Sequence, residues 1–161
     1  MLSTLKPTLY VQLSPECITV RNPKSGDFIS EVPELAMQHA PSQRIVATGS
    51  QARLHVAQPN TTVSNPFAHP RTLVSDFSGG EQVLKAFFAR LQKKSLFSFA
   101  PIVVLHPLGH PDGGFTQIEI RALHEMALGA GASQVIMWSG RSLTDQEALS
   151  LEFPAEGKRL E

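Results

Sequence analysis

The stretch of sequence that decides the fold is PIVVLHPLGHPDGGFTQIEIRALHEMALGAGASQVIMW, residues 101–138. Its first five residues are apolar and mostly β-branched, which is typical of a strand buried on both faces, although that run alone would also suit a buried helix. Residues 106–114 then contain two prolines and three glycines, so neither a helix nor a strand ladder continues through them.

A helix follows this turn. Thr116 can accept a hydrogen bond at the helix start, and Glu119 stands three residues on as its capping-box partner. The apolar positions that share one helical face are Ile120, Leu123, Ala127 and Ala130. Gly129 and Gly131 end the pattern, and residues 134–138 supply another apolar run. The whole stretch therefore predicts a strand, a helix and a second strand.

The first third of the chain predicts a β-meander. Residues 8–13 and 18–21 are expected to form two strands joined by a turn of hairpin length, and a third strand is expected near residues 28–32. Residues 45–48 predict a further strand and residues 50–56 a short helix. Strands first, then alternating strand and helix, favour an α/β or α+β domain with a mixed sheet.

The remaining segments differ in character. Residues 58–71 are rich in Pro, Asn, Thr and Ser and predict an irregular connection. Residues 81–94 predict a helix with one apolar face. The basic residues of this helix are Lys85, Arg90, Lys93 and Lys94. They can be interpreted as a solvated helix face, since the helix dipole favours positive charge near the C-terminus, or as a face that binds a partner. Residues 151–161 look like a loose C-terminal tail.

Composition narrows the function classes. A chain of 161 residues suits one domain, and 14 basic residues balance 14 acidic ones, so no overall field attracts nucleic acid or an anionic membrane. Cys17 is the single cysteine, which points to a reducing compartment. No apolar run approaches the roughly 18 residues of a membrane span, and the first residues do not resemble a signal peptide. We expect a soluble cytoplasmic protein.

Three segments, at residues 117–136, 46–52 and 72–77, together carry a family resemblance. QIEIRALHEMALGAGASQVI at residues 117–136 is similar to ERRAIRESAQGAGAREVFL of the bacterial actin MreB family, with the Gly-Ala-Gly-Ala turn as the sharpest element. VATGSQA at residues 46–52 resembles VAVGxxA, and TLVSDF at residues 72–77 resembles GVIADF. The order and approximate spacing agree, so the resemblance covers most of residues 8–150.

The resemblance implies a ribonuclease-H-like, actin-type lobe in which a β-meander continues into parallel strands flanked by helices. Residues 1–150 would form the first lobe, with a small inserted subdomain at about residues 33–75 and the tail at residues 151–161. The family's second lobe has no counterpart in this sequence. Because full-length members hold ATP between two such lobes, half of the binding surface would be missing.

The resemblance also locates a degenerate phosphate loop. The family's phosphate loop has the sequence DLGTANT, in which the Asp orients the metal and the Gly lets the backbone approach the phosphate. The matching positions of this chain are Gln12 in place of the Asp, then Leu13, and Ser14 in place of the Gly. Pro15 removes a backbone N–H that could have faced phosphate. The family's IEEPMAAAIG carries a catalytic Glu, and residues 138–144 here have no carboxylate at that place. We therefore expect no catalytic residue, no ATP or magnesium cofactor, and a pseudo-ATPase.

Other chemistry has less support. His106 and His110 are weak metal candidates, because their spacing is loose and a Pro/Gly loop usually holds solvated histidines. The glycines of that loop lack the Lys-Ser/Thr ending of a P-loop and suit turn chemistry. Cys17 has no identifiable orienting partner, and an unpaired cysteine usually behaves as a small buried hydrophobe.

Two functions follow from the resemblance. The first is a non-catalytic MreB/actin-like protein without the second lobe, a protein-interaction module connected with rod-shape-determining or other cytoskeletal components. Its partner would be a protein, such as a full-length bacterial actin or a second copy, and not nucleic acid. The alternative is an ATP-binding or ATP-hydrolysing protein whose site is completed by dimerisation.

Overall fold

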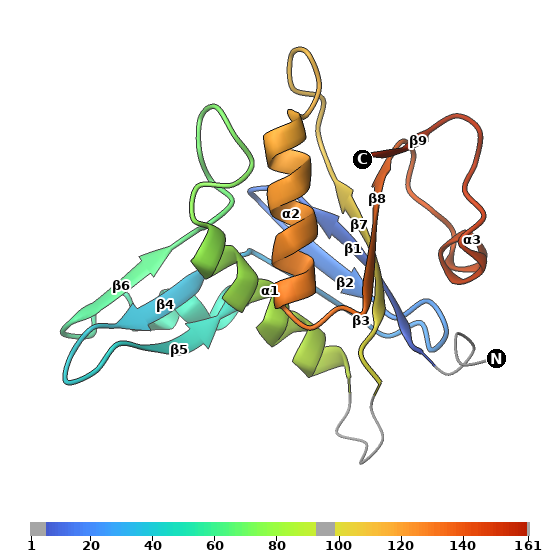
Figure 1. Ribbon diagram of the computed structural model, residues 1–161. Coiled ribbons are helices and arrows are strands. Elements are labelled where there is room, and N and C mark those ends of the chain that lie inside the picture. Colours follow the sequence, from blue (N-terminus) through green and yellow to red (C-terminus); the bar gives the residue numbers. More distant parts are fainter. Residues whose placement is uncertain (1–5, 93–98, 161) are drawn as a thin grey trace.

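The computed structural model describes residues 6–92 and 99–160 and contains two sheets of unequal size (Figure 1). The larger is a six-stranded mixed sheet with the order β3-β2-β1-β7-β8-β9, and the smaller has the order β5-β4-β6. The larger sheet and the helices beside it make up most of the protein, and the smaller sheet projects to one side (Figure 1).

The six-stranded sheet begins as the expected meander. Strands β1 (Thr8–Leu13), β2 (Ile18–Arg21) and β3 (Phe28–Glu31) pair antiparallel in sequence order. Strands β7 (Ile102–Pro107) and β8 (Gln134–Ser139) then run parallel to β1. This is the mixed α/β sheet predicted from the sequence, with the two apolar runs of residues 101–138 confirmed as strands.

Two helices cover one face of this sheet. They are α1 (Phe77–Leu91) and α2 (Gln117–Gly129), which pack side by side against the sheet residues Leu9, Val11 and Leu13 (Figure 1). The capping box at the start of α2 is confirmed, since the Thr116 side chain accepts from the Glu119 N–H and Glu119 accepts from the Thr116 N–H. Helix α1 begins earlier than expected because Asp76 caps it.

The opposite face has a second, smaller core. Tyr10, Val104 and Trp138 point to that side and are covered by Leu143 and the short helix α3 (Asp145–Ser150). Thr144 caps α3, because its side chain accepts a hydrogen bond from the Glu147 N–H. The alternation along β1 explains the two cores, because successive side chains of a strand point to opposite faces.

The smaller sheet lies within residues 33–75. It consists of β4 (Leu35–Gln38), β5 (Arg44–Thr48) and β6 (Thr61–Ser64), with the 3-10 helix η2 (Gly49–His55) between the last two. The prediction of an irregular connection over residues 58–71 is wrong in part, because Thr61–Ser64 pairs antiparallel with β4. Strand β4 was not predicted either.

The expectation of a loose C-terminal tail also needs correction. Residues Lys158–Leu160 form β9, which pairs antiparallel with Ser139, Trp138 and Met137 of β8. The Phe153 ring lies 5.1 Å from the Trp138 ring, so an aromatic contact holds the segment before β9 to the sheet. Among the helices of the described residues, none has the length and apolar character to cross a membrane.

Candidate functional site

The candidate site lies where the parallel strands end. The carboxyl ends of β1, β7 and β8 meet at one edge of the sheet, the place where open α/β sheets usually bind ligands. Gln12 comes from the end of β1, His106 from the end of β7, and Ser142 from the segment after β8. The fold thus brings together residues that are more than 90 positions apart.

Tyr10 and His106 form the buried part of this site. The Tyr10 Oη lies 2.7 Å from His106 Nδ1 and accepts a hydrogen bond of 3.1 Å from the Leu143 N–H. Burial raises the pKa of Tyr10 and lowers the pKa of His106. Because the Tyr10 Oη accepts from the Leu143 N–H, its own proton can go to His106 Nδ1, which fits a neutral imidazole that accepts at this nitrogen.

The Gln12 side chain also forms a hydrogen bond within the protein. Its Nε2 donates to the Ser142 Oγ at 2.8 Å, so the side chain spans from β1 to the segment after β8. A glutamine amide carries no charge, whereas magnesium sites are built on carboxylates and phosphate oxygens. The residue therefore acts as a cross-link between two segments.

The turn between β1 and β2 closes on itself. The Ser14 N–H donates to the Cys17 carbonyl at 2.9 Å, and the Cys17 N–H donates to the Ser14 Oγ at 3.2 Å. Pro15 has no N–H, and its carbonyl accepts from Asn65 Nδ2 at 2.7 Å. Leu13 is fully buried in the core. Three of the four turn residues, 14–17, consequently have no N–H to offer a phosphate.

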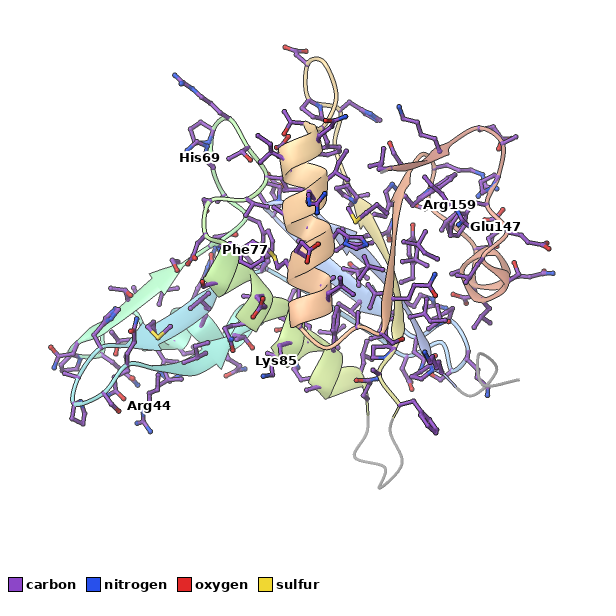
Figure 2. All side chains as sticks on the ribbon, viewed as in Figure 1. Arg44, His69, Phe77, Lys85, Glu147 and Arg159 are labelled. Atoms are coloured by element: carbon purple, nitrogen blue, oxygen red, sulfur yellow. The ribbon has the colours of Figure 1, made fainter. Side chains whose placement is uncertain are left out.

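Two ion pairs surround the site on the side of α3. Arg21 binds Asp145 through two hydrogen bonds of 2.7 Å, and its guanidinium lowers the pKa of that carboxyl. Arg141 binds Glu147 at 2.6 and 3.0 Å and lowers the pKa of Glu147 to about 2. Figure 2 shows Glu147 on this side of the sheet. These carboxylates neutralise arginines, so they are not poised for acid–base chemistry.

The two histidines proposed as metal candidates have different surroundings. His106 is buried against Tyr10, whereas His110 lies in the exposed loop after β7. Within residues 6–92 and 99–160, no three His, Cys, Asp or Glu side chains are placed to hold a metal ion. Cys17 is half-buried and lies 3.2 Å from the Ser30 Oγ and 3.8 Å from the Thr19 Oγ1.

The predicted basic face of α1 is only partly available. Lys85 is exposed on the outer side of the helix (Figure 2). Arg90 forms an ion pair with Glu31 of β3 and lies over the Phe87 ring, so it joins α1 to the sheet. Lys93 and Lys94 lie outside the described residues.

Sequence reasoning missed the residues that organise the site. Tyr10, Arg21 and Asp145 were not singled out, although Tyr10 contacts both β7 and the Leu143 backbone. A polar residue in a buried strand is one local signal, because a buried hydroxyl needs a hydrogen-bond partner. Nothing local in the sequence identifies that partner.

Comparisons with known proteins agree with this architecture. The family model described as MreB/Mbl protein matches residues 11–143. No curated protein matches the chain. Two solved structures of MreB5 of Spiroplasma citri, one bound to AMPPNP and one bound to ADP, each match with a TM-score of 0.63 and 21% sequence identity.

The extent of these matches differs between the chains. The match covers 82% of this chain, but only 38% of the AMPPNP-bound chain and 37% of the ADP-bound chain. The chain therefore spans well under half the length of these structures, and at this identity they establish the actin-like fold alone. The family model covers most of the sequence, from the first strand to the segment after β8. On these grounds the chain belongs to the MreB/Mbl family of actin-like proteins.

Proposed function

We propose that this actin-like lobe does not hydrolyse ATP and acts in the cytoplasm as a protein-interaction module connected with cell-shape or cytoskeletal components. Its partner is a full-length bacterial actin. The proposal rests on family membership and on the internal hydrogen bonds at the sheet edge where the family's nucleotide chemistry would be expected.

The observation that carries the proposal is the closed β1–β2 turn. Phosphate binding by a turn needs several backbone N–H groups that point outward. Here Ser14 and Cys17 use theirs within the turn, and Pro15 has none. The Gln12 Nε2 donates to the Ser142 Oγ, so three of the four turn residues have no free N–H and the Gln12 amide nitrogen is bonded within the protein, which supports the absence of nucleotide binding.

We place the contact with the partner on α1. Lys85 is exposed on the side of the helix away from the sheet, while the buried residues of the helix face α2 and the sheet. The nearby Glu31–Arg90 pair fixes the helix to β3, so Lys85 is presented on a rigid element.

Co-sedimentation tests this function. The purified chain is mixed with filaments of full-length MreB and centrifuged. We expect the chain to pellet with the filaments, and we expect Lys85→Glu to weaken this association by about fivefold because it reverses a charge at the contact.

The matched control is Lys24→Glu, which reverses an exposed lysine in the β2–β3 turn and should leave pelleting unchanged. If the chain stays in the supernatant at every filament concentration, the interaction function is wrong. If Lys24→Glu and Lys85→Glu weaken pelleting equally, the contact does not lie on α1.

A further inference from the structure

A pocket lies where strands β7 and β8 end, on the face of the sheet that α2 covers. Its volume is about 390 Å³. The loop after β7 lines it through His110, Gly113 and Gly114, and β9 lines it through Lys158. Open α/β sheets usually bind ligands beyond the carboxyl ends of their parallel strands, and small-ligand pockets have volumes of about 300–1,000 Å³. The position therefore suits a binding site, and the volume suits a small molecule.

The register of β9 determines which polar side chains the sheet presents to this pocket. Lys158 pairs with Ser139, the last residue of β8, so the two side chains lie on the same face of the sheet. Met137 lies two positions before Ser139 and belongs to the same core cluster as Leu123 of α2. Because alternate residues of a strand share a face, the ammonium of Lys158 and the hydroxyl of Ser139 both lie on the α2 side, where the pocket is.

The charge of the pocket is positive. Lys158 is exposed and has no ion-pair partner among residues 6–92 and 99–160. The described residues that line the pocket include no carboxylate. Asp112 of the loop and Glu156 before β9 are exposed and do not line it, and Glu119 of α2 is buried and accepts from the Leu73 N–H at 2.9 Å. The pocket therefore favours a negatively charged group on its ligand.

Backbone N–H groups of the loop add hydrogen-bond donors. The Gly114 N–H donates to the Pro111 carbonyl at 2.8 Å and closes a turn. Within the described part of the chain, the N–H groups of His110 and Gly113 donate to no protein acceptor. Gly113 and Gly114 both have a φ of 80°, which residues with a side chain rarely adopt, so no side chain from these two positions fills the pocket. The loop can thus donate hydrogen bonds to an anion in the pocket.

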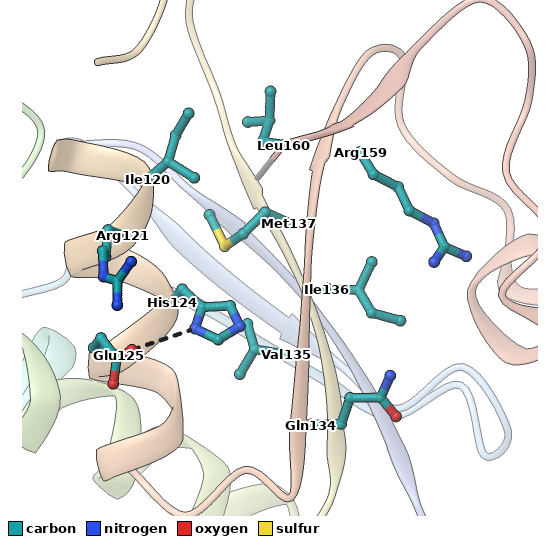
Figure 3. Close-up of a pocket in the computed structure, with 10 residues that line it drawn as sticks. All are labelled: Ile120, Arg121, His124, Glu125, Gln134, Val135, Ile136, Met137, Arg159 and Leu160. Atoms are coloured by element: carbon teal, nitrogen blue, oxygen red, sulfur yellow. Dashed lines mark ion pairs between the residues drawn. The ribbon is translucent and has the colours of Figure 1, made fainter. Parts of the chain in front are cut away.

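Another part of the lining is apolar and held in place. Phe115, Ile120 and Leu160 line the pocket and pack in or against the main core. Figure 3 shows Ile120 on α2 and Leu160 on β9 in a neighbouring groove, and the same two side chains also line the pocket. A ligand with an apolar body would contact these side chains while its charged end contacts Lys158.

A single ammonium group suits a carboxylate better than a phosphate. A phosphate monoester carries about −1.5 to −2 charges at neutral pH, whereas an ionised carboxylate carries one negative charge. Lys158 is the one lysine or arginine among the described residues that line the pocket. A monoanion therefore matches the charge of the pocket without leaving excess negative charge there.

We propose that the pocket formed by the loop of residues 109–115, α2 and β9 binds a small organic carboxylate that has an apolar body. Lys158, Ser139 and the loop N–H groups bind the carboxylate, and the apolar body lies against Phe115, Ile120 and Leu160. This site does not include the closed β1–β2 turn and does not depend on the proposed interaction with a bacterial actin.

NMR titration of the isotopically labelled chain tests this site with three probes. Hexanoate has both the negative charge and an apolar body, hexylammonium has the same body with the opposite charge, and acetate has the charge with little apolar body. We expect hexanoate to shift the amide signals of Gly113 and Gly114 saturably and to bind at least about tenfold more tightly than either other probe. Equal binding of hexanoate and hexylammonium, or no saturable shift of these glycine signals with hexanoate, would overturn the proposal.

Variants connect the binding to the polar side chains of the pocket. Lys158→Gln should weaken hexanoate binding by at least about fivefold, while Lys158→Arg retains it within about twofold. Ser139→Ala is a smaller change and should weaken binding by about threefold, because one hydrogen-bond donor is lost. The matched control is Lys24→Gln in the β2–β3 turn, which should leave binding unchanged. Unchanged binding in either Lys158→Gln or Ser139→Ala, or an equal loss in Lys24→Gln, would contradict the proposed site.

Discussion

At the scale of single residues, the sheet edge keeps its polar groups satisfied from within. The Tyr10 hydroxyl, the His106 ring and the Leu143 N–H form one chain of hydrogen bonds beneath the surface. Within the described residues, no buried side-chain nitrogen or oxygen lacks a hydrogen-bond partner. A buried polar group that is bonded internally stabilises one arrangement, because leaving it unpaired is costly.

The buried imidazole should make stability depend on pH. The pKa of His106 is lower in the folded protein than the unfolded value of about 6.5, so between the two the unfolded state binds the extra proton. Stability is then fully present above the unfolded pKa and falls as the pH falls toward the folded one. We expect the free energy of unfolding, measured with urea, to decrease from about pH 7 to about pH 5.

His106→Gln should flatten this part of the pH profile, because the titrating ring is gone. The matched control is His110→Gln in the exposed loop, for which the profile of the parent protein is expected. An unchanged slope in His106→Gln would show that another group is responsible.

At the scale of elements, the sequence predicted those helices and strands that have clear apolar patterns, turns or caps. The strand–helix–strand of residues 101–138 combines an apolar run, a Pro/Gly turn and a capping box, and the structure confirms each part. Strands β4 and β6 are four residues long, and β6 is at most half-buried. A strand of four residues is too short to show a clear periodicity, and pairing with neighbours decides whether it forms.

The candidate site was predictable only in outline. Ser14 and Pro15 suggested from the sequence that the turn of residues 14–17 does not bind phosphate, and this stays a prediction. The contact of Tyr10 with Leu143 spans 133 residues, and that of Arg21 with Asp145 spans 124. Such contacts depend on how the chain packs, which no local pattern encodes. The same reason explains why β9 was taken for a tail.

The attachment of β9 depends on a close approach of backbone to Trp138. A Cβ added at Gly157 would lie 2.3 Å from Trp138 Cη2 and 2.5 Å from the Ser139 carbonyl oxygen, which is backbone. Gly157→Ala should therefore destabilise the protein by about 1–3 kcal/mol and move β9 away from β8. Urea denaturation gives the loss of stability, and fluorescence of the single tryptophan reports its greater exposure.

Ala155→Ser is the matched control for this change. It alters an exposed residue in the same segment and should leave stability within about 0.5 kcal/mol of the parent value. Equal stability of Gly157→Ala and the parent would contradict the close packing of this segment against Trp138.

At the scale of the whole molecule, the chain has an actin-like fold in which the polar groups at the ends of the central strands are bonded within the protein. The chain matches the fold of MreB5 over 82% of its length. At the ends of the central strands, however, the polar groups are bonded to one another and the β1–β2 turn is closed. The chain therefore has the fold of its family, but hydrogen bonds within the protein engage the polar groups at its strand ends.

Isothermal titration calorimetry of the chain with ATP in the presence of magnesium tests this account most directly. MreB5 of Spiroplasma citri, whose solved structure holds AMPPNP, serves as the positive control with that nucleotide. We predict no measurable heat of binding for this chain, because its turn offers too few N–H groups and Gln12 is engaged by Ser142. Saturable binding with a dissociation constant of about 1 μM to 10 μM would contradict it.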